Sequence, residues 1–75
     1  MTKQDFIEEL KDIMEIDQLS DDQPLNEIDE FDSLAVMSIV AFSFSNFHKK
    51  LSGNDIKNAK SVNDLITLIG VENIQ

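Results

Sequence analysis

The segment EIDEFDSLAVMSIVAF, residues 27–42, decides the fold of this chain because it changes abruptly from an acidic, turn-rich sequence to an apolar run. The change falls at Ser33. From Leu34 to Phe47 the apolar residues are so closely spaced that they occupy almost the whole circumference of a helix. Such a helix is buried on several sides or presents an apolar surface to a partner. We therefore predict a central helix over residues 33–47 that does both.

Capping signals and apolar spacing predict three further helices around the central one. The S/T-x-x-D/E pattern that caps helix N-termini begins at Thr2, Ser52 and Ser61. The predicted helices span about residues 2–16, 54–60 and 62–69, and the last one stops at Gly70. The result is an all-α chain with four helices around one core, of which the third is short.

The polar segment between the first two predicted helices, residues 17–32, is too long for an ordinary connection. It also contains four spaced apolar residues: Leu19, Leu25, Ile28 and Phe31. Because these residues can anchor the segment to the core, we predict a long ordered loop.

The composition restricts the function to few classes. Seventy-five residues allow a single domain, residues 1–75, with a small core, because so short a chain buries only about 60% of its unfolded surface. Fifteen acidic residues oppose six lysines and no arginine, so a phosphate-neutralising surface is missing and nucleic acid is a poor partner. No apolar run reaches about 18 residues and no secretory signal is visible, so we expect no integral membrane segment and a cytoplasmic location.

The charge is distributed unevenly along the chain. Residues 1–32 hold twelve acids and two lysines, a net charge of −10, whereas residues 33–75 hold three acids and four lysines, a net charge of +1. This asymmetry is typical of a protein whose basic partner approaches from one side. An acidic face that serves only solubility explains the charge equally well.

The residues needed for an enzyme or a metal site are missing. Cysteine is absent, and the single histidine, His48, is expected just past a helix end, where it favours the helix dipole. Along one helix, His48 and Ser33 would lie roughly 22 Å apart, so they form no catalytic dyad. A calcium loop begun at Asp17 would place Ile28 where the bidentate glutamate belongs. We therefore expect neither an enzyme nor a metal site.

Ser33 lies at the predicted start of a helix, where unpaired N–H groups and the helix dipole favour an attached phosphodiester. The alternative is that Asp32 or Ser33 only caps the helix. The motif FDSL, residues 31–34, resembles the D-S-L motif of the acyl carrier proteins, whose serine receives 4′-phosphopantetheine from coenzyme A. The resemblance covers nearly the whole chain: an N-terminal helix, a long anchored loop, D-S-L opening the second helix, Phe47 fourteen residues after the serine, then a short helix and a last one.

This resemblance implies a small antiparallel four-helix bundle in which Ser33 bears the arm and Asp32 assists the modifying transferase and its magnesium ion. Leu34 and Met37 would face partners. The interior would be lined by Ile39, Val40 and Phe47. The implied protein is a monomer that carries acyl or aminoacyl groups as thioesters. Its implied partners are a phosphopantetheinyl transferase, an acyl- or aminoacyl-activating enzyme, and a downstream acyltransferase or synthase of fatty acid, lipid, polyketide or other specialised biosynthesis.

The chain departs from the carriers of fatty-acid synthesis in two ways. Many of those carriers have a glycine three residues before the serine, where this chain has Glu30, and EIDEFDSLAVM is closer to the E-W-D-S-L-A type of specialised, stand-alone bacterial carriers. They also have acids along the second helix, at positions that here hold Ala35, Ser38, Phe44, Ser45 and Asn46. The acids of this chain precede the serine instead. We therefore expect partners to contact three of them, Glu27, Asp29 and Glu30, here named the acidic loop face.

An alternative function needs no modification. The second reading, after the carrier, is an unmodified acidic helical module that binds partners through the apolar surface of its second helix.

Overall fold

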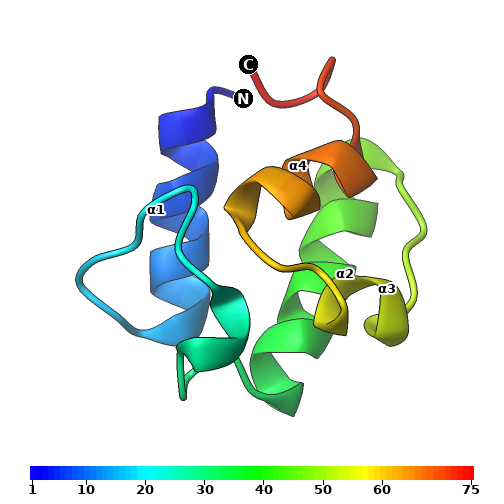
Figure 1. Cartoon of the computed structure of the whole chain (residues 1–75). Helices are drawn as coiled ribbons and strands as arrows, with labels where there is room; N and C mark the ends of the chain where they lie inside the picture. The colour runs from blue at the N-terminus through cyan, green and yellow to red at the C-terminus, as the bar shows by residue number, and fades with distance from the viewer.

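The computed structural model covers all 75 residues and consists of α-helices without strands (Figure 1). The helices are α1 (Lys3–Met14), α2 (Ser33–Phe47), α3 (Gly53–Lys57) and α4 (Val62–Ile69), and a 3₁₀ turn, η1 (Leu25–Glu27), interrupts the connection between α1 and α2. This confirms the prediction of an all-α chain with four helices, and the bounds of α2 agree with the predicted ones. The chain is compact, with extents of 27 × 23 × 18 Å, and its two ends lie together.

Two of the three predicted capping boxes are present. The Asp5 N–H donates to Thr2 Oγ1 at 3.0 Å, and the Asp55 N–H donates to Ser52 Oγ at 3.1 Å, which starts α1 and α3 as predicted. The box predicted at Ser61 is wrong. The Ser61 side chain makes no capping bond, and the Asp64 carboxylate accepts from the Lys60 N–H at 2.8 Å rather than from the Ser61 N–H.

Two helices end earlier than predicted. α1 stops at Met14 rather than near residue 16 because Glu15 adopts a left-handed conformation, with φ of 57°. The Ile16 N–H then bonds back to the Lys11 carbonyl at 3.0 Å, which closes the helix and returns the chain to the core. α3 stops at Lys57 rather than residue 60, and the chain that follows it pairs with the long loop. α4 ends where predicted, before Gly70.

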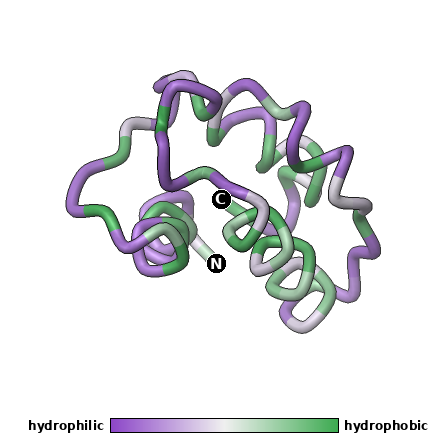
Figure 2. Tube along the Cα trace, turned by 90° about the horizontal axis from the view of Figure 1, so that it is seen from below, coloured by the Kyte–Doolittle hydropathy of each residue, from purple (hydrophilic) through white to green (hydrophobic).

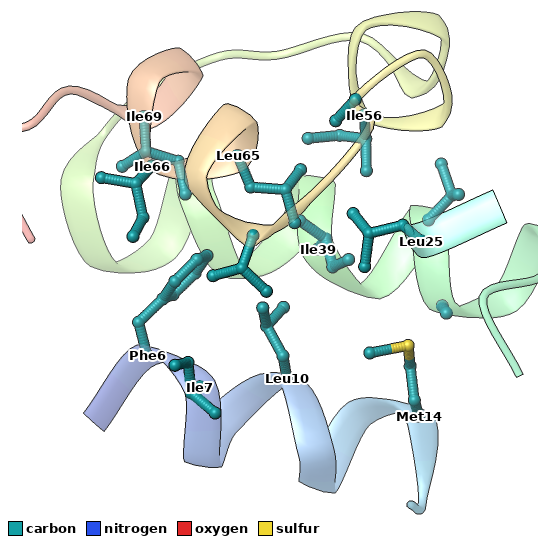
Figure 3. Close-up of a cluster of buried hydrophobic side chains, with 14 of the residues drawn as sticks. Phe6, Ile7, Leu10, Met14, Leu25, Ile39, Ile56, Leu65, Ile66 and Ile69 are labelled. Carbon is teal, nitrogen blue, oxygen red and sulfur yellow. The ribbon is translucent and has the colours of Figure 1, made fainter. Parts of the chain in front are cut away.

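The core is built by apolar side chains from all four helices and η1. Figure 3 shows Phe6, Leu10 and Met14 pointing from α1 toward the side chains of α2 and α4. The other labelled members are Ile7, Leu25, Ile39, Ile56, Leu65, Ile66 and Ile69. The three α2 residues that were expected to line the interior differ in burial. Ile39 is fully buried, whereas Val40 and Phe47 are half-buried and pack against the core.

The long loop between α1 and α2 is tied to the rest of the chain at several points. Its four apolar residues all contact the core, and Leu25 is fully buried. In Figure 2 the segment leaving α1 accordingly alternates between purple and green. The Leu25 N–H donates to the Lys60 carbonyl at 2.8 Å, and the Asn63 N–H donates to the Asp21 carbonyl at 3.3 Å. These hydrogen bonds tie the loop to the connection between α3 and α4 and to the start of α4.

The Asp21 side chain adds an ion pair with Lys3 at the start of α1. The hydrogen bond and the charge of Lys3 hold the pKa of Asp21 below its usual value. The Lys11 side chain lowers the pKa of Glu8 in the same way.

No helix of the chain is both long enough and apolar enough to cross a membrane.

Candidate functional site

Ser33 is the first residue of α2, and its hydroxyl does not cap the helix. The cap is Asp32, which has an extended backbone and accepts the Ala35 N–H on Oδ1 at 3.0 Å. The Ser33 side chain is exposed and makes no hydrogen bond within the protein. Of the two capping residues that the sequence allows, the structure therefore selects Asp32, and the Ser33 hydroxyl is free for another use.

A groove of about 550 Å³ opens beside Ser33, between the first turns of α2 and the beginning of α3. The α2 side is formed by Asp32, Ser33, Val36 and Met37, with Phe31 from the loop; the α3 side is formed by Ser52, Gly53, Asn54 and Lys57. The two sides approach closely, since a Cβ atom on Gly53 would lie 3.7 Å from Val36 Cγ1. The volume of the groove lies within the range of small-molecule binding sites.

The groove is lined partly by residues that the sequence predicted to belong to the site and partly by residues that it did not. Asp32, Ser33 and Met37 were expected at the site and lie together in it. The α3 side was missed. The capping box at Ser52 correctly indicates where α3 begins, but it carries no information on which face of α3 turns toward Ser33.

The charges around Ser33 are of opposite sign on the two sides of the groove. Asp32 and the acidic loop face are exposed on the side before α2, and none of these carboxylates makes an ion pair. Lys57 is the one cationic side chain that lines the groove. It is also unpaired, because the two ion pairs of the chain are Lys3–Asp21 and Lys11–Glu8.

Three large apolar side chains of α2 are exposed. Leu34 is 80% exposed and Met37 61% exposed, as expected for residues that face a partner. Phe44, which the sequence left without a direction, lies on the same side of the helix with 53% of its surface exposed. Leu34, Met37 and Phe44 are spaced by three and seven residues, so they form one stripe along the helix, here named the α2 stripe. α2 itself contains no charged residue.

His48 lies at the opposite end of α2 from Ser33. It adopts a left-handed conformation with φ of 54°, and its ring lies edge-on to Phe44 at 6.2 Å between centroids. It therefore takes no part in the chemistry of Ser33.

The site thus offers an exposed primary hydroxyl at a helix N-terminus, next to a groove lined by Phe31, Val36 and Met37 together with polar residues and the charged Asp32 and Lys57. Comparison with protein-family models, with curated proteins and with solved structures finds no match to this chain.

Proposed function

We propose that this protein is a discrete acyl carrier protein, which carries acyl or aminoacyl groups as thioesters on a 4′-phosphopantetheine arm attached to Ser33. The observation that supports this most is the free Ser33 hydroxyl. Aspartate and serine are about equally good helix N-caps. Here Asp32 is the cap, and Ser33 is left exposed beside a groove.

The residues around Ser33 fit a phosphopantetheine group. A phosphodiester on Oγ would lie at the N-terminus of a 15-residue helix, where the dipole favours an anion. Phe31, Val36 and Met37 offer apolar surface to the chain of the arm, and Asn54 and Ser52 offer polar groups to its amides. When bound, the arm would supply the thiol that this cysteine-free chain lacks.

The chain's own part in its modification is to present the hydroxyl. Ser33 Oγ would form the bond to phosphorus and give up its proton, while the adenosine bisphosphate part of coenzyme A leaves. The base and the magnesium ion for this step would come with a phosphopantetheinyl transferase. The second carboxylate oxygen of Asp32, which makes no bond within the protein, is free to assist at that complex.

The proposal includes the finer features of the carrier family. These are an antiparallel bundle, a monomeric working state, a cytoplasmic location and partners that activate, transfer or condense acyl groups. We propose that partners contact the acidic loop face (Glu27, Asp29 and Glu30) together with Leu34 and Met37. All five side chains are exposed. The acidic loop face would speed the encounter, and the apolar pair would fix the docked orientation.

The test is the intact mass of the protein after incubation with coenzyme A, magnesium and a broad-specificity phosphopantetheinyl transferase. We expect a gain of one phosphopantetheine on the wild type, and none on Ser33→Ala. Ser38→Ala is the matched control, because Ser38 is an exposed serine on the same helix and should leave the gain unchanged.

The second candidate is the unmodified interaction module, which is favoured by the exposed α2 stripe. Failure of several transferases to modify the folded wild type would refute the carrier function and favour this candidate.

A further inference from the structure

The groove beside Ser33 has one feature that the attachment of an arm does not require. Lys57 lies one helical turn after Gly53, so the two residues share a face of α3. Gly53 lies against Val36 of α2, which turns this face toward the first turns of α2. Lys57 accordingly lines the same groove as Ser33, although it lies 24 residues later in the sequence.

The surroundings of Ser33 make this lysine significant. Asp32 and the acidic loop face already concentrate negative charge at the start of α2. A phosphodiester on Ser33 would add a further negative charge at that place. Lys57 is the one cation that lines the groove, and it has no competing carboxylate partner. Lysine binds phosphate groups as a compact point charge, and such charge-assisted hydrogen bonds are stronger than neutral ones.

We propose that Lys57 is a positioning residue that pairs with the phosphodiester on Ser33 and directs the arm into the groove between α2 and α3. This inference rests on the proposed function. The pair would fix the first part of the arm, and the chain beyond it would lie over Val36 and Met37. The loaded protein would then have a resting state in which the arm lies on the protein, and a partner would draw the arm out by replacing contacts in the groove.

The experiment uses the holo protein, enriched in ¹³C and ¹⁵N, with an unlabelled arm added by the transferase. Isotope-filtered nuclear Overhauser spectra report which protein protons lie near the methyl groups of the arm. In the wild type we expect contacts from these methyl groups to Val36 and Met37, and we expect them to be lost in 1 M NaCl, which screens an exposed pair. Lys57→Gln should lose the contacts at low salt and shift the phosphorus resonance, whereas Lys57→Arg should keep the contacts.

Lys49→Gln is the control, because Lys49 is also exposed but lies outside the groove. It should leave both signals unchanged. Wild-type holo protein without contacts between arm and groove, or Lys57→Gln protein that keeps them, would overturn this inference and leave the carrier function standing. A chain that gains no arm would overturn both, and the intact mass separates that outcome from the others.

Discussion

Replacing Ser43 by alanine is expected to stabilise the protein, although most substitutions in a core are destabilising. Ser43 is the one polar side chain that is buried, with none of its surface exposed. Its hydroxyl oxygen has no hydrogen-bond partner. The folded state therefore bears the cost of removing this hydroxyl from water without the compensating bond, and the Ser43→Ala variant does not.

The size of the effect follows from two contributions. A buried polar group without a partner costs about 1–3 kcal/mol, which alanine would recover. Alanine also has the higher helix propensity, by about 0.5 kcal/mol, wherever serine is replaced in a helix. Ser38→Ala measures the propensity contribution alone, because Ser38 is exposed on the same helix. The difference between the two variants therefore gives the contribution of the buried hydroxyl. Ser43→Ala should therefore stabilise the protein by about 1–3 kcal/mol more than Ser38→Ala does.

The assay is urea unfolding followed by circular dichroism, supported by thermal unfolding. In a chain of this size, about 1 kcal/mol corresponds to a rise in Tm of about 4–8 °C. The slope of the unfolding free energy against urea should be the same for both variants, so that the midpoints report stability. If Ser43→Ala gains no more than Ser38→Ala, the hydroxyl is satisfied in solution and the reasoning from an unpartnered oxygen is refuted.

Three other perturbations test the cap, the acidic loop face and the ion pair of the loop. Asp32→Ala should lose the helix cap and about 1 kcal/mol of unfolding free energy, whereas Asp32→Asn should keep the cap. Both variants should be modified more slowly by the transferase. An unchanged rate for Asp32→Asn would exclude a role for the charge of Asp32. Replacing all three residues of the acidic loop face by lysine should lower the rate of modification at low salt, and the wild-type and variant rates should converge at high salt. Equal rates at low salt would show that this face is not part of the docking surface. Lys3 depresses the pKa of Asp21, so the stability that this pair adds is present above the usual Asp21 pKa of 3.8 and is lost as the pH falls through the lower, folded-state value. The difference in urea midpoint between wild type and Lys3→Gln should therefore shrink from pH 6 to pH 3, and a constant difference would show that the pair does not titrate in this way.

The start of α2 could be predicted from the sequence because its signals are local. The sequence changes from acids to apolar residues at Ser33, directly after the capping residue Asp32, and the structure begins the helix there. The box at Ser61 shows the limit of such signals. Ser61 and Asp64 have the right spacing, yet the Asp64 carboxylate bonds the Lys60 N–H. The spacing alone cannot decide which of several nearby N–H groups a short carboxylate will bond.

The direction of side chains around α2 could not be predicted, and the reason is physical. A helix that is apolar on all sides has no polar face to indicate which side is buried. Tertiary packing sets these directions. Phe42 turns inward, with its ring centroid 6.0 Å from that of Phe6 and 5.9 Å from that of Phe47, whereas Phe44 is exposed. The buried position of Ser43 follows from the same rotation. Lys57 and Ser33 line the same groove through tertiary packing of α2 against α3, which has no signal in the spacing.

The separation of charge from apolar surface in this chain has a consequence for how a partner would dock. The acidic loop face lies at one end of α2, and the α2 stripe runs along a helix without any charge. Charges act over about a Debye length and raise the encounter rate, whereas apolar contacts act only at short range. A partner attracted to the acidic end is therefore brought first to Ser33, and the α2 stripe then sets its orientation. Because the stripe is narrow, a contact through it would be small, as in transient complexes, and the proposed carrier function would need such a quick release.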